Sequence, residues 1–269
     1  MSQRTVSRLL RKGWDALETE DYDGAESLGR RALLADPDSV EARLLLGNAL
    51  LGREDYPAAA EVLHGAVERA PDDPEPRTDL AISLFQMCDF RGARTEIESA
   101  LGLREKFADG HYWMALCLER EGDYRGADRE YARAHALDPE EFPLPVRVSP
   151  DDFRRILQDA VEHLPEEFQG ALKNLSIEVE DLPGEELLRD SDPPMDPSLL
   201  GLFEGVPKGR GSLLDSPRLP DRIVLFQRNI ERRCQDRDEL VEDILVTIRH
   251  EVGHYLGLEE DDLERCGYE

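Results

Sequence analysis

Basic residues and cysteines are scarce in this chain, and long apolar runs are absent. Its 269 residues include 33 Lys and Arg against 60 Asp and Glu, for a formal net charge of -27. Because such a charge repels phosphate backbones, we expect no binding to nucleic acid. No apolar run is long enough to cross a bilayer, and the first residues, Met-Ser-Gln-Arg-Thr-Val, lack the apolar core of a signal peptide. We therefore expect a cytoplasmic protein that does not bind membranes.

The cysteines show none of the Cys-x-x-Cys spacing that is typical of metal or redox sites. They are Cys88, Cys117, Cys234 and Cys266. Two of them lie in apolar helical contexts, where a free thiol packs like a small hydrophobic side chain. We predict that the cysteines are reduced. An incidental metal or redox role for Cys266 is the alternative, because this residue lies near the candidate site described below.

The glycine-rich segment from Gly205 to Pro220 lacks the pattern of a phosphate-binding loop. It contains Lys208-Gly209-Arg210-Gly211, whereas such a loop needs Gly-x-x-x-x-Gly-Lys followed by Ser or Thr. Nucleotide binding is therefore not expected. We interpret the segment as a mobile loop near the candidate site whose basic residues could guide a substrate, with a merely solvated loop as the alternative.

What the first half of the chain does have is a period of 34 residues. An aspartate followed by an aromatic residue recurs at Asp21-Tyr22, Asp55-Tyr56, Asp89-Phe90 and Asp123-Tyr124. Small residues recur in three columns: Gly13, Gly47, Ala81 and Ala115; Ala25, Ala59, Ala93 and Ala127; and Ala32, Ala66, Ala100 and Ala134. Proline closes three of the units, at Pro37, Pro71 and Pro139, and Glu105 replaces it in the third. Small residues let helices approach closely and proline ends a helix, so each unit is predicted to be a helix pair.

This pattern resembles the tetratricopeptide repeat. The resemblance implies an all-α solenoid in residues 1–141, with units at about 6–39, 40–73, 74–107 and 108–141. Such a solenoid presents a concave surface that commonly binds an extended peptide or a partner helix, so we expect a protein partner there. Residues that could line the groove are Arg43, Arg77, His111 and Tyr112, although scattered surface arginines are the commoner explanation. We expect Trp14 and Trp113 to pack in the core.

Prolines separate this region from the rest of the chain. Pro143 and Pro145 prevent a helix, so residues 142–149 are predicted to form a semi-rigid extended linker. Ser149 can cap a new helix that has Pro150 at its first position. A second short helix is predicted from Pro165 to about Leu172.

Three short strands are predicted after these helices. Ile177 and Val179 alternate with polar residues, as in a half-buried strand. Residues 223–226 are continuously apolar, which suits a central strand. Residues 199–204 are the third candidate.

Residues 250–254 read His-Glu-Val-Gly-His, near the end of an apolar periodic segment that Gly257 terminates. On a helix, His250 and His254 are four residues apart and project from the same face. Two neutral imidazoles on one face can chelate Zn²⁺, while Glu251 can polarise a water in an open coordination position. This arrangement indicates peptide-bond hydrolysis, with a chance spacing as the alternative.

A catalytic zinc site needs a third protein ligand, which we expect just after the helix. Gly257 can take a positive φ and end the helix. Glu260 lies three residues further on, within the carboxylate run from Glu259 to Asp262. Such a run is usually a solvated surface or the first turn of another helix. We choose Glu260, and the other carboxylates of the run stay as alternatives.

Residues 150–269 resemble the bacterial minimal-zincin metallopeptidase family. The signature His-Glu-x-x-His-x-x-Gly-x-x-acid is matched by His250, Glu251, His254, Gly257 and Glu260. Three further blocks occur in the same order as in the family: residues 177–183, 201–207 and 219–226. The resemblance implies a small mixed α/β domain in which the motif helix lies under a short sheet, with Asp or Glu as third ligand.

The sequence thus predicts a multidomain protein, an all-α tetratricopeptide solenoid followed by a small α/β minimal-zincin domain with a short mixed sheet. We expect a zinc-dependent metallopeptidase in which His250, His254 and Glu260 hold Zn²⁺ and Glu251 is the general base. The repeats are expected to recruit a protein partner or a peptide or protein substrate.

The sequence leaves open the oxyanion-stabilising residue and the choice between two functions. Tyr255, Tyr268 and Arg222 are candidates for stabilising the oxyanion, by proximity or chain position alone. The alternative function is a non-catalytic adaptor, whose repeats bind a partner and whose zincin-like domain is structural. Glu251 favours hydrolysis, because a purely structural site needs ligands and no base.

Overall fold

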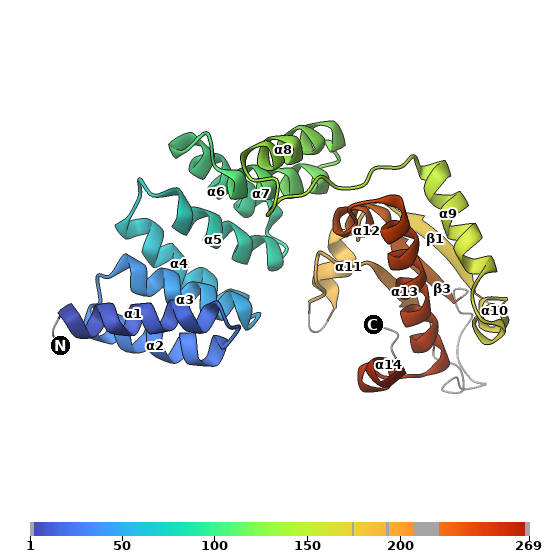
Figure 1. Cartoon of the computed structure of the whole chain (residues 1–269), viewed down its shortest axis with the longest axis horizontal. Helices are drawn as coiled ribbons and strands as arrows, with labels where there is room; N and C mark the ends of the chain where they lie inside the picture. Colours follow the sequence, from blue (N-terminus) through green and yellow to red (C-terminus); the bar gives the residue numbers. More distant parts are fainter. Residues whose placement is uncertain (1–2, 174, 192–193, 207–220, 267–269) are drawn as a thin grey trace. The chain divides into compact units, whose positions relative to one another are not determined.

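The computed structural model describes residues 3–173, 175–191, 194–206 and 221–266. The chain divides into two compact units, residues 1–142 and 143–269 (Figure 1). None of the helices in the described part of the chain is long and apolar enough to cross a membrane.

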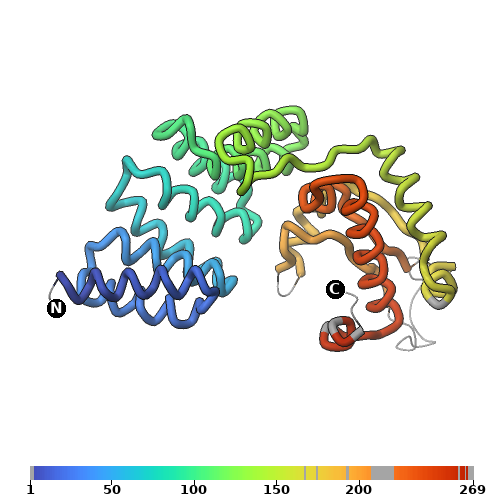
Figure 2. The backbone as a smooth tube through the Cα atoms, in the orientation of Figure 1, coloured from blue at the N-terminus to red at the C-terminus, as the bar shows by residue number. Residues whose placement is uncertain are grey.

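The first unit is a row of helices in which each helix packs against the next one in the chain (Figures 1 and 2). The helices are α1 (Gln3–Leu17), α2 (Tyr22–Ala35), α3 (Val40–Gly52), α4 (Tyr56–Arg69), α5 (Pro74–Gln86), α6 (Phe90–Leu103), α7 (Ala108–Arg120) and α8 (Tyr124–Leu137). Helices α1, α3, α5 and α7 also contact one another in sequence. The 34-residue period therefore corresponds to stacked helix pairs, and the predicted solenoid is confirmed.

The aspartate column of the repeat caps every second helix. Each of Asp21, Asp55, Asp89 and Asp123 accepts a hydrogen bond from the backbone N–H three residues further on. These bonds satisfy donors that the first turn of a helix leaves without partners, and each cap stabilises the fold by ~1 kcal/mol. The aromatic residue that follows each aspartate is the first residue of the capped helix.

The small-residue columns lie where the helices meet. All the alanines of the second and third columns are at most 1% exposed. A Cβ atom added at Gly13 would lie 2.3 Å from Leu45 Cδ2, and one at Gly47 would lie 2.5 Å from Leu63 Cδ2. Small residues are therefore needed for α1 to approach α3 and for α3 to approach α4.

The turn inside each repeat carries a residue in the left-handed conformation. Glu20, Glu54, Cys88 and Gly122 have φ values of 57°, 60°, 60° and 78°, again at intervals of one repeat. This conformation costs an L residue about 1 kcal/mol, and the aspartate cap that follows each turn offsets a similar amount.

Two candidate groove residues form pairs within their own repeats. Arg77 Nη1 on α5 donates to Glu96 Oε2 on α6 at 2.8 Å, and His111 Nδ1 on α7 lies 2.7 Å from Glu130 Oε2 on α8. The two pairs occupy equivalent positions one repeat apart. The other ring nitrogen of His111 lies 2.8 Å from the carbonyl oxygen of Glu105, the residue that replaces the repeat proline. Arg77 and His111 thus hold their helix pairs together.

The two tryptophans pack as the sequence predicted. Trp14 lies against the core formed by α1, α2 and α3. Trp113 on α7 packs edge-on against Phe85 of α5, with ring centroids 5.5 Å apart. Both rings therefore connect neighbouring helices.

The second unit is a three-stranded mixed sheet with helices around it (Figure 1). Its elements are α9 (Pro150–Glu162), α10 (Glu166–Leu172), β1 (Ser176–Glu180), α11 (Glu185–Asp190), β2 (Gly201–Glu204), β3 (Arg222–Phe226), α12 (Gln227–Arg233), α13 (Arg237–Leu256) and α14 (Glu260–Cys266). The strand order is β1-β3-β2, with β1 parallel and β2 antiparallel to β3. The predicted short mixed sheet is confirmed.

The long helix α13 is the centre of this unit. It contacts β2, β3, α9, α10 and α12. Ile223 and Leu225 of β3 and Ile244, Ile248 and Val252 of α13 are fully buried in one core. The central strand β3 is buried on both faces, whereas β1 alternates between exposed and half-buried residues, as its sequence predicted.

The second half of the proline-rich segment lies on α12. Glu231 is 1% exposed, and its carboxylate accepts hydrogen bonds from Val148 N at 3.2 Å and Arg147 Nη1 at 3.0 Å. Its carbonyl oxygen also accepts a bond from Val146 N at 3.0 Å. Residues 146–148, which the sequence places in a linker, are therefore held on α12 by the buried carboxylate and the backbone carbonyl of Glu231.

Asp79 on α5 is expected to make the stability of the first unit depend on pH. It accepts a hydrogen bond from Asn48 Nδ2 at 2.8 Å, and burial raises its pKa to about 7. Because the folded state then binds this proton more tightly than the unfolded chain, stability falls as pH rises from about 4 to about 7. Asp79→Asn should keep the contact with Asn48 and raise the free energy of unfolding by ~1–2 kcal/mol at pH 8, with little change at pH 4.

Denaturant unfolding of the full chain at both pH values, followed by circular dichroism, measures this difference. Asp72→Asn, in the exposed turn before α5, is the matched control and should have little effect at either pH. An equal gain for Asp79→Asn at pH 4 and pH 8 would show that the carboxyl group does not titrate as described.

Candidate metal centre

The motif His250–His254 lies in the last turns of α13. Asp236 caps this helix by accepting hydrogen bonds from the backbone N–H groups of Asp238 and Glu239. Gly257 ends it with a φ of 87°, a left-handed conformation that glycine adopts without strain. The helix and its end are therefore where the sequence predicted them.

The two histidines converge on one point beside the helix. Their Nε2 atoms are 3.0 Å apart, and both side chains are half-buried. Two zinc–nitrogen bonds of about 2.0–2.1 Å at a tetrahedral angle would separate the nitrogens by about 3.3 Å. The pair thus has nearly the spacing that a single tetrahedral zinc ion requires, and imidazole nitrogens are suitable zinc ligands.

The carboxylate of Glu251 is fixed by the edge strand of the sheet. Glu251 is 5% exposed, and its Oε2 accepts a hydrogen bond from Phe203 N of β2 at 2.6 Å. The backbone of β2 comes this close because Gly201 has no side chain. A Cβ atom there would lie 2.6 Å from Thr247 Cγ2 and 3.3 Å from Glu251 Cγ. These contacts could not be predicted from sequence patterns, because Phe203 and Glu251 are 48 positions apart.

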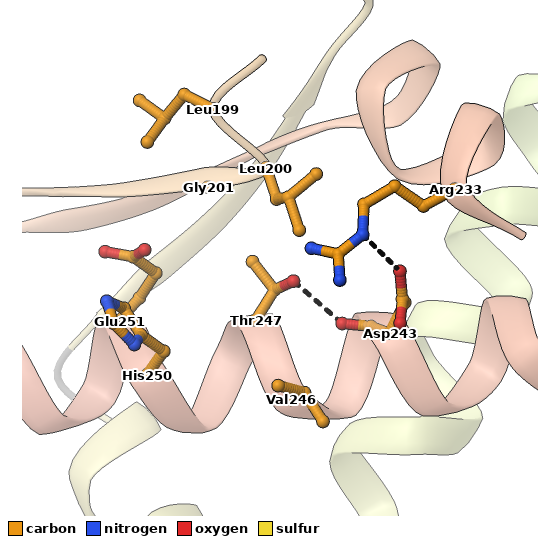
Figure 3. A pocket seen from close by; sticks show the side chains of 9 residues that line it. All are labelled: Leu199, Leu200, Gly201, Arg233, Asp243, Val246, Thr247, His250 and Glu251. Carbon is orange, nitrogen blue, oxygen red and sulfur yellow. Dashed lines mark hydrogen bonds and ion pairs between the residues drawn. The ribbon is translucent and has the colours of Figure 1, made fainter. Parts of the chain in front are cut away.

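Glu251 and His250 border a cavity of about 290 Å³ between α13 and the start of β2 (Figure 3). Figure 3 shows Leu199 and Leu200 on one side and Val246 and Thr247 on the other. The cavity's remaining lining residues are Gly201, Arg233 and Asp243. The candidate base therefore faces a space large enough for part of a peptide.

The proposed third ligand is the part of the site that the structure leaves open. Glu260 is the first residue of α14, and its side chain lies outside the part of the chain that the structure describes. Among the described residues, no group of three or more His, Cys, Asp or Glu side chains is placed to hold a metal ion. Asp262 is paired with Arg265 at 2.8 Å, which makes it a poorer candidate than Glu260.

The oxyanion candidates have different surroundings. Arg222 on β3 donates to Glu178 of β1 at 2.5 Å and to Glu204 of β2 at 2.7 Å, so it joins the three strands. Tyr255 is buried and packs edge-on against Phe203, with ring centroids 5.7 Å apart. Tyr268 lies outside the described residues, as do Lys208 and Arg210.

The described cysteines are buried thiols. Cys88, Cys117 and Cys234 form no disulfide bond, in agreement with the prediction that they are reduced. Burial raises the pKa of Cys117 and of Cys234 to about 12, so neither thiol is a ready nucleophile or ligand at neutral pH. The side chain of Cys266 lies outside the described residues.

Comparisons with known proteins give a family description for each half of the chain. Residues 172–268 match the model of a zincin-like metallopeptidase, and residues 16–77 and 50–117 match that of the tetratricopeptide repeat. A search of curated proteins found no match. Among solved structures, a crystal structure of MamA is 25% identical, with a TM-score of 0.43, over 47% of this chain and 74% of that one. A MamA fragment from Desulfovibrio magneticus RS-1 is 20% identical, with a TM-score of 0.45, over 50% and 76%.

Gly201→Ala is expected to push β2 away from α13. The new Cβ atom meets Thr247 Cγ2, so the strand must move and the hydrogen bond between Phe203 and Glu251 must lengthen. We expect a loss of ~1–3 kcal/mol in the free energy of unfolding, as for other overpacked sites. The double variant Gly201→Ala with Thr247→Ser removes the clashing methyl group and should recover most of this loss.

Denaturant unfolding of the full-length variants measures both effects. Gly184→Ala is the control, because a Cβ atom there meets nothing within 4 Å. If Thr247→Ser fails to rescue Gly201→Ala, the close contact between β2 and α13 is not the cause of the loss.

Proposed function

This chain carries a zincin-like metallopeptidase domain behind tetratricopeptide repeats, and we propose that it is a zinc-dependent peptidase to which the repeats bring a protein partner or substrate. The observation that carries the proposal is the convergence of His250 and His254, with Nε2 atoms 3.0 Å apart, next to the carboxylate of Glu251. Two histidine ligands alone would be compatible with a structural metal site. A carboxylate beside them that also lines a cavity favours a catalytic site, because it can accept a proton from a bound water.

His250, His254 and Glu260 are the proposed zinc ligands. When bound, zinc would supply the Lewis acidity that activates water for attack on a peptide carbonyl. Glu260 is included because α14 begins there, shortly after the left-handed turn at Gly257 that ends α13. A ligand from the start of α14 completes a set of three and leaves a fourth position open for reaction.

Glu251 is the proposed general base. Its carboxylate takes a proton from the attacking water and returns it to the nitrogen of the leaving amine, so the peptide bond breaks with no net change in the enzyme. The hydrogen bond from Phe203 N holds one oxygen, Oε2, and the cavity lies on the same side of α13. The carboxylate is therefore oriented before a substrate arrives, which is what efficient proton transfer requires.

The repeats are proposed to recruit a protein rather than a nucleic acid or a membrane. A stack of helix pairs offers an extended surface for a peptide or helix, and a net charge of -27 disfavours nucleic acid.

The purified protein is expected to bind about one zinc ion per chain. His250→Ala or His254→Ala should abolish stoichiometric binding, because each removes one of the two converging imidazoles. Metal analysis after dialysis measures this. His163→Ala, whose ring caps the end of α9, is the control and should leave zinc content unchanged. Stoichiometric zinc in both motif variants would disprove the ligand assignment.

The third ligand is tested by the same measurement with competing chelators. Glu260→Ala should weaken zinc affinity by at least tenfold, and Glu260→Asp should retain binding. Glu259→Ala, Asp261→Ala and Asp262→Ala are matched controls from the same carboxylate run and should each have little effect. A larger loss at Asp261 or Asp262 than at Glu260 would identify a different ligand.

Glu251→Gln is expected to separate metal binding from catalysis. The amide cannot take a proton from water, so peptide hydrolysis should fall by about 10²–10⁴-fold while zinc content stays the same. The assay is cleavage of a peptide mixture by the zinc-loaded protein, followed by mass spectrometry, with and without a chelator. Unchanged turnover would exclude the role of base. A zinc-loaded wild type that cleaves nothing would favour the adaptor function.

A further inference from the structure

The cavity beside Glu251 extends along α13 toward the N-terminal end of the helix. Its lining residues on this helix are Asp243, Val246, Thr247, His250 and Glu251, so it starts at the candidate metal centre and leads away from His254. Its volume of about 290 Å³ is at the lower end of the range for ligand cavities. This is room for one amino-acid side chain and part of its backbone.

The walls of the cavity are apolar and its far end is charged. Figure 3 shows the side chain of Leu200 pointing toward Thr247, and Leu199 and Val246 also line the cavity. Beyond them lie Arg233, the last residue of α12, and Asp243 of α13. A side chain that enters from Glu251 would therefore pass along hydrocarbon before it meets a charge.

The guanidinium of Arg233 is oriented to receive that side chain. Its Nε atom lies 3.6 Å from Asp243 Oδ2, which is too long for a strong hydrogen bond. This is the only ion pair of Arg233 with the residues that the structure describes. Figure 3 shows its terminal nitrogens directed into the cavity, toward Leu200 and Thr247. A planar pair of N–H donors of this kind matches the two oxygens of a carboxylate.

We propose that this cavity binds the side chain of a substrate residue that borders the cleaved bond, and that Arg233 makes it select glutamate. The inference rests on the proposed peptidase function, since it assumes that Glu251 marks the position of the bond. Thr247 precedes Glu251 by four residues, or about 6 Å along the helix. An extended glutamate side chain reaches about 5 Å from its Cα, so its carboxylate arrives near the guanidinium. Aspartate is one methylene shorter and fits less well.

Asp243 has a positioning role in this scheme. It faces the Nε edge of the guanidinium, so an incoming carboxylate meets the other edge and the two acids do not compete for the same donors. Thr247 Oγ1 donates to the carbonyl oxygen of Asp243 at 2.7 Å, which keeps this hydroxyl away from the ligand and leaves its methyl group on the cavity wall.

The cleavage experiment starts with the zinc-loaded full-length protein and a peptide whose cut site is known from mass spectrometry. Each of the two residues that border the cut is then replaced in turn by Glu, Asp, Gln, Leu and Lys. At one of the two positions, Glu should give a kcat/KM about tenfold above Gln and Leu, as expected for one charge-assisted pair that is partly exposed. Arg233→Leu and Arg233→Gln should remove this preference, and Arg233→Glu should shift it toward Lys.

Arg237→Leu is the matched control, because it removes the same charge from the exposed first turn of α13, outside the cavity. It should keep the preference for Glu. A wild type that cleaves peptides but does not prefer Glu at either position would overturn the inference and leave the peptidase function intact. A preference for Glu that persists in both Arg233→Leu and Arg233→Gln would also overturn the inference and leave the peptidase function intact.

A binding measurement makes the test independent of turnover. Fluorescent peptides with Glu or Leu at the selected position are titrated into the zinc-loaded Glu251→Gln protein, and anisotropy reports the Kd. The Glu peptide should bind about tenfold more weakly when Arg233→Leu is added, whereas the Leu peptide should be unaffected. If no peptide is ever cleaved but this difference is found, the cavity's selectivity stands and the peptidase function fails. If Arg233→Leu changes neither Kd, the selectivity itself is wrong.

Discussion

The second unit depends on the close contact between the edge strand β2 and helix α13. In an antiparallel pair, alternate N–H groups point away from the neighbouring strand. Leu200 O bonds to Phe226 N of β3, and Phe203 N turns outward to Glu251. The contact satisfies a donor at the edge of the sheet and holds the carboxylate of the candidate base. It also places Leu199 and Leu200 beside the cavity. The position of β2, the orientation of Glu251 and the cavity wall therefore all depend on the close approach of Gly201 to α13.

The first unit is stabilised by the same local interactions repeated in each helix pair. Each repeat has a left-handed residue, an aspartate cap and alanines at the helix contacts, and Arg77 with Glu96 and His111 with Glu130 add a polar pair at equivalent positions. Since an aspartate cap contributes only about 1 kcal/mol and offsets the similar cost of the left-handed residue before it, no single feature decides the fold. Their regular spacing is what makes the solenoid, and it leaves the sequence of the exposed positions free to specify a partner.

Periodic features could be predicted from the sequence, and contacts between distant residues could not. The period of 34 residues, the alternation in β1 and the glycine that ends α13 are local signals, and each was correct. The hydrogen bond of Phe203 to Glu251 joins residues 48 positions apart and follows no periodic rule. Arg222 shows the same limit: its chain position gave no indication that it would bridge Glu178 of β1 and Glu204 of β2. Glu260 stays a prediction, because only its backbone position is described.

A preference for glutamate has to be reconciled with a strongly acidic chain. The net charge of -27 repels acidic peptides at long range, but at physiological salt this repulsion is screened beyond about 8 Å. In the proposed complex Arg233 acts at contact, well within this distance, but its side chain is 61% exposed, so the attraction is modest. Recruitment by the repeats would raise the local concentration of a substrate and offset the slower encounter. Under the proposed function, long-range charge limits which peptides arrive unaided, and the cavity would select among those that arrive.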